Sequence, residues 1–163
     1  MKKILKNVLV LLITITVFVF TGCFASAKTF SKEGMSIELT NDFVEKEYIS
    51  MTCYYESPEM LVMVLKDEFS LNPSIKNWSI MQYAQAVGNA NRLTSVDIYT
   101  SENGYAFFEY ARSSSGNDYT YFATCHKADD AFWLIQFGCF TKDYDDLKGD
   151  MEKYANSIVF ENS

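Results

Sequence analysis

The chain has 163 residues, of which 48% are hydrophobic and 16% aromatic, so it holds enough apolar material for one folded domain and is not globally disordered. Its formal net charge is −7, from 14 basic and 21 acidic side chains. Removing residues 1–27, which contain three lysines and no acid, leaves 11 basic and 21 acidic side chains, a net charge of −10. This excess argues against nucleic acid and anionic lipid as partners. It is compatible with cationic partners or with solubility alone.

The first residues predict an exported protein. Lys2, Lys3 and Lys6 precede the run Val8–Phe20, which contains only apolar residues and Thr. A basic start before such a run is typical of a secretory signal sequence, and the run is shorter than the about 20 residues of a membrane span. We therefore assign residues 1–27 to a signal sequence and residues 28–163 to a single domain.

Two processing sites compete at the end of this segment. Phe20-Thr21-Gly22-Cys23 resembles a bacterial lipobox, with Phe in place of the usual Leu, whereas Ala25-Ser26-Ala27 fits ordinary signal peptidase. A lipid on Cys23 would tether the protein to the outer face of the cytoplasmic membrane, and cleavage after Ala27 would release a secreted protein. We favour lipidation at Cys23. Both alternatives predict a bacterial, extracytoplasmic protein.

The rest of the chain alternates between strand patterns and two helix patterns. Strands are predicted at Lys28–Phe30, Gly34–Thr40, Thr52–Glu56, Met60–Leu65, Ser95–Ser101, Tyr105–Arg112, Tyr119–His126 and Ala131–Phe140. Phe43–Ile49 is ambiguous between helix and strand. Asn103-Gly104 and Ser113–Asn117 predict hairpin turns. The run 131–140 is apolar on both alternating faces, apart from Gln136, so it predicts a central strand with a packed layer on either side.

Two amphipathic helices are expected. Ser79 and Gln82 form a capping-box pattern before Ile80, Tyr83, Ala84 and Val87, which share one helical face. A second helix is predicted from Asp143 to Ile158, with an apolar stripe of Tyr144, Leu147, Met151, Tyr154 and Ile158. A short extended piece, 158–160, ends the pattern.

Together these elements predict an α+β domain with an antiparallel sheet of six or seven strands covered by helices. The order of elements resembles the PsbP-like α/β/α sandwich, from Gly34–Leu39, through the inserted helix and the long meander, to Asp130–Phe137, a helix and Ser157–Phe160. One departure is Asn41-Asp42, where relatives usually carry a proline near the first turn. The resemblance covers nearly all of residues 28–161 and implies a binding or accessory domain. It carries no shared active site.

No catalytic, cofactor-binding or metal-binding residue is predicted. His126, the single histidine, is expected to be an exposed residue at a strand end, and Glu109 is a possible buried acid. Ser113–Gly116 lacks the context of a phosphate loop. Asp143, Asp145, Asp146 and Asp150 fail the spacing of a calcium loop and fit a solvated helix start. The tyrosines are interpreted first as packing residues of the sheet and second as a binding groove.

The cysteines are predicted not to form a Cys125–Cys139 bridge. A turn at Lys127–Asp130 would place His126 opposite Ala131 and separate the two cysteines by seven residues, about 23 Å, whereas bridged Cα atoms lie within about 7 Å. Cys53 could still pair with either.

The favoured function is an exported, membrane-tethered binding or accessory domain without catalysis and without a cofactor, whose partner is an unknown protein or small ligand. One alternative is a hydrolase that uses Glu109 or His126. Another is a subunit that binds an envelope protein through a sheet edge or a tyrosine patch.

Overall fold

A computed structural model describes residues 26–93 and 96–161. Its centre is a seven-stranded antiparallel sheet with spatial order β3-β4-β5-β9-β8-β7-β6. The strands are β3 (Val44–Lys46), β4 (Cys53–Glu56), β5 (Leu61–Glu68), β6 (Tyr99–Thr100), β7 (Ala106–Ser114), β8 (Asn117–Lys127) and β9 (Ala131–Phe140). The ambiguous segment is therefore a short edge strand. Of the strand predicted over 95–101, only β6 forms within the described residues.

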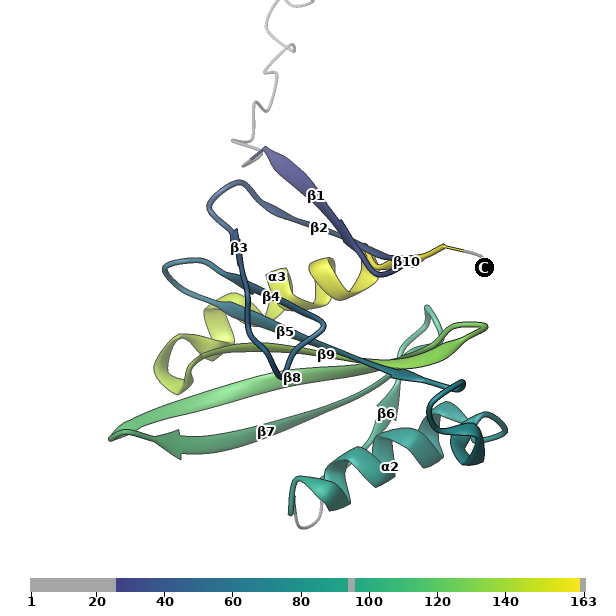
Figure 1. The fold of residues 1–163 in the computed structure, drawn as a ribbon. Coiled ribbons are helices and arrows are strands. Elements are labelled where there is room, and N and C mark those ends of the chain that lie inside the picture. Colours follow the sequence, from purple (N-terminus) through teal and green to yellow (C-terminus); the bar gives the residue numbers. More distant parts are fainter. Residues whose placement is uncertain (1–25, 94–95, 162–163) are drawn as a thin grey trace, which may run out of the picture.

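Two helices and a small second sheet cover this sheet. The small sheet has the order β1-β2-β10. Its strands are β1 (Ala27–Lys32), β2 (Met35–Thr40) and β10 (Val159–Phe160), and the helices are α2 (Ile80–Ala90) and α3 (Tyr144–Asn156), with 3-10 turns at Pro73–Ile75 and Thr141–Asp143. Figure 1 shows α2 on one side of the large sheet and α3 with the small sheet on the other. The predicted α/β/α layering is confirmed. No helix within the described ranges is long and apolar enough to cross a membrane.

The central position of β9 confirms the prediction from its apolar run. It pairs with β5 on one side and β8 on the other. Trp133, Ile135 and Phe137 pack into a core with α3 and the small sheet, while Phe132 and Leu134 pack into a second core with α2. Both cores depend on this strand, because its side chains alternate between the two faces.

Helix α2 starts where the capping box predicts. The Ser79 side chain accepts from the Gln82 backbone N–H at 3.2 Å, and the Gln82 side chain accepts from the Ser79 backbone N–H at 2.8 Å. The helix ends at Ala90, beyond which Arg92 has a positive φ of 57°. Tyr83 and Ala84 are its most buried apolar residues, as the helical spacing predicts.

Two turns are tighter than predicted. Ser114 pairs with Asn117, so only Ser115 and Gly116 form the turn, both with positive φ as a two-residue hairpin of this kind requires. The β8–β9 turn is also short, because the Ala128 N–H bonds to the Ala131 carbonyl at 2.9 Å.

The short β8–β9 turn corrects the predicted register. His126 lies opposite Trp133, not opposite Ala131, and Cys139 lies opposite Thr120. The shift is two residues, which preserves the face of every side chain. Cys125 is then five positions from Thr120 along β8, about 17 Å. Cys53, Cys125 and Cys139 are all buried and unpaired, so the absence of a Cys125–Cys139 bridge agrees with the prediction despite the wrong register.

Candidate functional site

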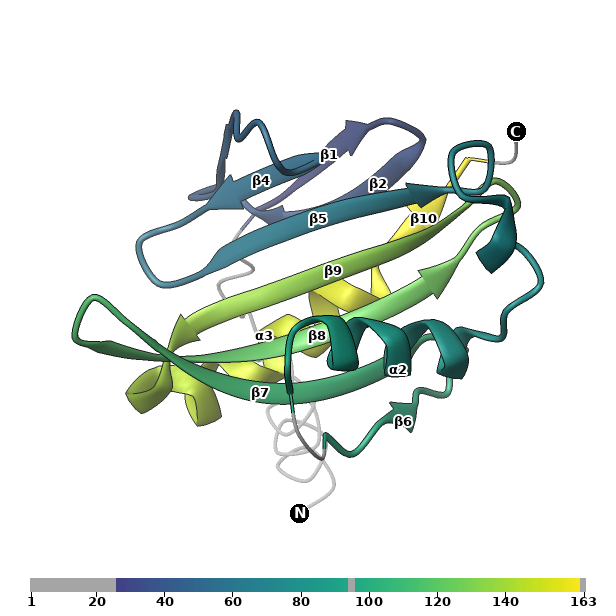
Figure 2. The same cartoon turned by 60° about the horizontal axis from the view of Figure 1, so that its bottom comes forward.

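The α2 side of the large sheet is covered over only part of its area. Helix α2 contacts β7 and β8, and its Tyr83 stacks on Phe132 of β9 with ring centroids 4.3 Å apart. Figure 2 shows this side, with no helix over β4, β5 or the ends of β7 and β8 at their shared hairpin. The uncovered strands therefore present side chains directly to solvent.

The uncovered area is a continuous surface that we call the aromatic face. It consists of Tyr54, Leu61, Met63, Tyr110, Tyr119, Tyr121 and Phe140. Strand register places them together, because Leu61, Gly138, Tyr121 and Tyr110 are successive cross-strand partners on β5, β9, β8 and β7. Phe140 is 39% exposed, and the other six side chains are half-buried. A surface of this composition is typical of a binding site.

The rings of this face are held in fixed orientations by one another. Tyr110 and Tyr121 stack at 4.8 Å between centroids with planes 11° apart, and Tyr119 stacks on Phe140 at 5.1 Å. Tyr121 leans over Gly138, where an added Cβ would lie 2.6 Å from its Cε1 atom. Glycine is thus needed at position 138 because the ring occupies the place of a side chain.

The one polar residue within the central apolar run also belongs to this region. Gln136 is 8% exposed, and its Oε1 accepts a hydrogen bond of 2.5 Å from the Tyr110 hydroxyl. Burial raises the pKa of the Tyr110 hydroxyl, so the hydroxyl stays protonated and donates. Gln136 therefore satisfies a hydroxyl that the stacked ring would otherwise bury without a partner.

A hollow of about 190 Å³ lies within the aromatic face, and we call it the Tyr54 hollow. Its lining includes Tyr54, Glu56, Glu59, Leu61, Tyr119 and Phe140, and no lysine or arginine. Lys46 Nζ forms an ion pair of 2.6 Å with Glu56 Oε2 from the neighbouring strand. Burial, and then the Glu56 carboxylate, raise the pKa of the Tyr54 hydroxyl. The hollow thus combines neutral aromatic rings with two carboxylates.

Exposed apolar side chains continue this surface onto the sheet edge. Val44, on edge strand β3, is 52% exposed, Tyr48 is 61% exposed, and Ile49 is fully exposed. The Tyr48 ring lies 5.3 Å from that of Tyr54. The edge therefore meets the aromatic face at the Tyr48–Tyr54 contact, and the exposed Lys46–Glu56 ion pair lies on the same surface.

His126 is buried, which contradicts the expected exposed position. It is 8% exposed on the α3 side of the sheet, and its ring lies 4.9 Å from that of Tyr105 and 5.5 Å from that of Phe160. Its Nε2 atom is 3.1 Å from Thr124 Oγ1. Burial lowers its pKa to about 4. The sequence suggested exposure because His126 is near a turn, but β10 folds back over this strand end.

Glu109 is exposed rather than buried, which corrects the second expectation. Its Oε1 accepts from Lys148 Nζ at 2.6 Å, and its side chain is 37% exposed. Glu109 lies opposite Phe122 on β8, four residues from His126, about 13 Å along the strand. Glu109 and His126, either of which the hydrolase alternative could use, therefore lie apart.

The remaining residues singled out in the sequence lie apart from the aromatic face or outside the structure. Ser115 and Gly116 form the β7–β8 turn. Asp145, Asp146 and Asp150 are exposed on α3, as a solvated helix requires. Within residues 26–93 and 96–161, no cluster of His, Cys, Asp and Glu could hold a metal ion. Cys23 lies outside the described residues.

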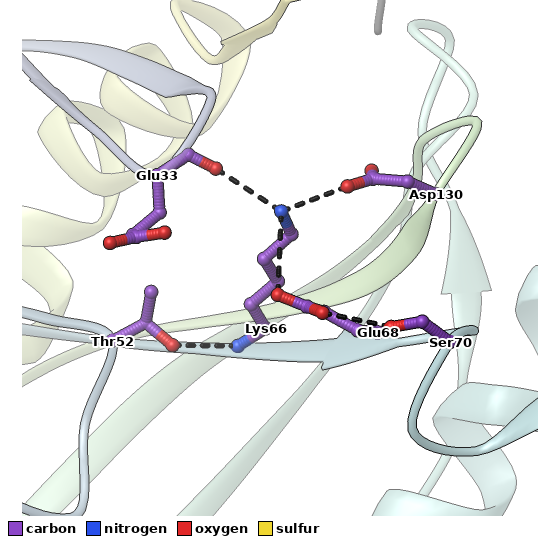
Figure 3. A network of polar contacts seen from close by, with 6 residues as sticks. All are labelled: Glu33, Thr52, Lys66, Glu68, Ser70 and Asp130. Carbon is purple, nitrogen blue, oxygen red and sulfur yellow. Dashed lines mark hydrogen bonds and ion pairs between the residues drawn. The ribbon is translucent and has the colours of Figure 1, made fainter.

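A polar network on the α3 side connects the two sheets. Lys66 Nζ on β5 contacts Asp130 Oδ2 at 2.8 Å, the Glu33 carbonyl at 3.3 Å and Glu68 Oε1 at 3.9 Å (Figure 3). The Thr52 hydroxyl accepts from the Lys66 backbone N–H at 2.9 Å. Lys66 also lies 5.2 Å from the Trp133 ring centroid. Because Glu33 belongs to the β1–β2 turn, this network links the small sheet to β5 of the large sheet and has a structural role.

The fold matches several solved structures, one of which is a PsbP. Cyanobacterial PsbP from Synechocystis sp. PCC 6803 aligns with a TM-score of 0.57 at 9% identity over 83% of this chain and 93% of its own. A mutant of the protein Mog1 aligns with a TM-score of 0.58 at 7% identity, over 85% of this chain and 97% of its own. A structure from Bacteroides thetaiotaomicron gives 0.57 at 12% identity, over 83% of this chain and 49% of that one. No protein-family model and no curated protein matched. The chain therefore has a PsbP-like fold, as predicted.

The sequence contains a signal for the aromatic face, its tyrosines, which fit either sheet packing or a binding groove. Tyr119 and Tyr121 occupy alternate positions of β8, and such alternation is typical of any half-covered strand. What the pattern does not contain is the place of α2 on the sheet, which leaves the β7–β8 hairpin uncovered (Figure 2). Cross-strand register, which assembles the face, also has no local sequence signature.

Proposed function

We propose that this PsbP-like domain is an exported binding or accessory domain of the bacterial cell envelope, without catalysis of its own, and that it binds a protein partner through the aromatic face. The observation that carries the proposal is the uncovered aromatic half of the sheet. Tyrosine is enriched at protein interfaces, because it offers a large rigid contact area and a hydroxyl that tolerates water. The fold similarity fits an accessory role and adds no chemistry.

The proposed location rests on the first residues of the chain. Cys23 stands four residues before β1, which starts at Ala27. A lipid on Cys23 would leave Phe24–Ser26 as the tether, which spans at most about 11 Å when extended. The domain would then stay close to the membrane surface, where partners anchored in the same membrane are concentrated. Mass spectrometry of the mature N-terminus tests this, and an unmodified start at Lys28 would refute the lipoprotein proposal.

The absence of catalysis in the proposal is supported by the surroundings of the two candidate residues. His126 is enclosed by aromatic rings, and Glu109 is engaged by Lys148. Neither lines the Tyr54 hollow. A general base must reach its substrate within hydrogen-bond distance, which a histidine buried under β10 does not.

Crosslinking in native membranes tests the binding role. The wild-type protein is compared with the double variant Tyr119→Ser/Phe140→Ser, and with Tyr99→Ser as a matched control. Tyr99 is 54% exposed but lies on β6, the opposite edge of the sheet. We expect the double variant to lose a specific crosslinked partner about tenfold or more, since anchor residues contribute about 2 kcal/mol or more, and the control to retain it. A partner retained equally by all three proteins would refute binding through this face.

A further inference from the structure

We propose that the Tyr54 hollow receives a single arginine or lysine side chain from a basic segment of the partner protein. This inference rests on the proposed binding role of the aromatic face and adds the chemistry of the group that is recognised. The hollow has the features of a cation site on a protein surface, in its size, its rings and its charge.

The size and lining fit one long side chain. The volume of about 190 Å³ is bounded by Tyr54, Tyr119 and Phe140 around Leu61 and Gly138. An extended alkyl stem can lie on these apolar surfaces while its charged end reaches the rim, as such side chains do elsewhere. The walls are firm, because Tyr119 and Phe140 stack on each other at 5.1 Å.

The charge of the hollow favours a cation. Glu56 and Glu59 both line it, and no basic residue does. Ring faces attract cations, arginine more often than lysine. The aromatic face already shows this contact, since the Arg112 guanidinium lies 5.9 Å from the Tyr110 ring centroid. The domain charge of −10 after removal of residues 1–27 would also steer a basic partner toward the protein at low salt.

Lys46 is the internal competitor for this site. Its ammonium pairs with Glu56 Oε2 at 2.6 Å, and the two side chains are 51% and 42% exposed. Removing Lys46 would leave the Glu56 carboxylate to the incoming cation. The proposal therefore predicts a gain of binding on one substitution and a loss on another, a pair of opposite changes that general loosening of the fold cannot produce.

The experiment is an NMR titration of the mature protein with a capped Gly-Gly-Arg-Gly-Gly peptide. A matched peptide carries citrulline, the neutral isostere, in place of arginine. We expect saturable shifts at Tyr54, Glu59 and Tyr119 with the arginine peptide, and about fivefold weaker binding with citrulline, the equivalent of about 1 kcal/mol. Raising the salt from 0.05 M to 0.5 M is expected to weaken only the arginine peptide.

Three variants complete the test. Glu59→Gln is expected to weaken arginine binding about threefold and Lys46→Met to strengthen it about twofold, as expected for exposed charges. Glu152→Gln, exposed on α3, is the matched control and is expected to change nothing. Equal binding of the arginine and citrulline peptides, or no response to Glu59→Gln and Lys46→Met, would overturn the cation site. The binding role itself fails only if the Tyr119→Ser/Phe140→Ser protein keeps its native partner, so the two failures are distinguishable.

Discussion

The two faces of the large sheet use aromatic residues in different ways. On the α3 side, Phe122, Trp133 and Phe137 are at most 1% exposed beneath α3 and the small sheet (Figure 1). On the α2 side, the aromatic face is left open beyond the end of α2, and there tyrosine predominates. A tyrosine ring can pack on a sheet while its hydroxyl remains near water, and phenylalanine gains more from complete burial.

The contrast teaches that neither alternation nor residue type alone reports the extent of cover, since Tyr55 is 0% exposed in the α3-side core and Phe140 is 39% exposed on the α2 side. Both faces of β8 alternate in the same way, with Phe122 and Thr124 on one side and Tyr121 and Ala123 on the other. Only the covering elements distinguish a core from an open surface. The covered face should therefore determine stability, and the aromatic face should contribute to binding at little cost in stability.

The largest expected difference between the faces is in the loss of stability when a phenylalanine of β9 is replaced by alanine on each face. Phe137→Ala should lower the free energy of unfolding by about 3–5 kcal/mol, because it leaves a cavity in the closed core. Phe140→Ala should lower it by about 1 kcal/mol or less, because that ring is already 39% exposed. Urea unfolding of both variants measures this. Equal losses would show that the aromatic face is part of the core.

Lowering the pH should destabilise the folded protein through His126 on the covered face. Its pKa falls from 6.5 in the unfolded chain to about 4 in the folded protein, because burial disfavours the charged ring. The unfolded state therefore binds the proton first as the pH falls, and folding loses up to about 3 kcal/mol between pH 6.5 and 4. The His126→Leu variant should show a flatter dependence of stability on pH over this range. If both proteins lose stability in parallel, His126 does not titrate as its burial implies.

The contrast also explains which features the sequence could predict. The apolar run of β9, the capping box at Ser79 and the stripe of α3 each depend on neighbours within one element, and the structure confirms all three. The fold class followed from their order. These signals are local, so a single sequence contains them.

The features that escaped prediction depend on distant segments. His126 is buried by Phe160, which is 34 residues further along the chain. Glu109 is exposed and forms an ion pair with Lys148 on α3. The β8–β9 register depended on a turn two residues shorter than expected, and turn length has only a weak sequence signal. A tyrosine groove or patch was only an alternative in the sequence for the same reason, since its extent depends on where α2 lies on the sheet.

A smaller loss of stability is expected when Gly138 on the open face is replaced by alanine, which adds one methyl group. Gly138→Ala would place its Cβ 2.6 Å from Tyr121 Cε1 and 3.1 Å from Leu61 Cδ1, so the Tyr121 ring must move. Because that ring borders solvent, we expect a cost of about 1–2 kcal/mol, the lower part of the range for overpacking. Chemical shifts of Tyr110 and Tyr121 should change while those of Trp133 do not. A loss as large as that of Phe137→Ala would show that the face resists rearrangement as a closed core does.

The smallest effect is expected at the border of the covered face, in the network of Figure 3. Asp130→Asn removes the 2.8 Å ion pair with Lys66, in which the Asp130 side chain is 44% exposed. We expect a loss of about 0.5–1 kcal/mol, because water compensates exposed charges, and the loss should shrink in 1 M salt, where the screening length is about 3 Å. Asp129→Asn, in the same turn, is the matched control. Lys66 keeps its bond to the Glu33 carbonyl, so the small sheet should stay attached, with unchanged amide exchange in β2. A salt-independent loss above about 2 kcal/mol would show instead that the network behaves as a buried ion pair, and the closed face would then extend to this turn.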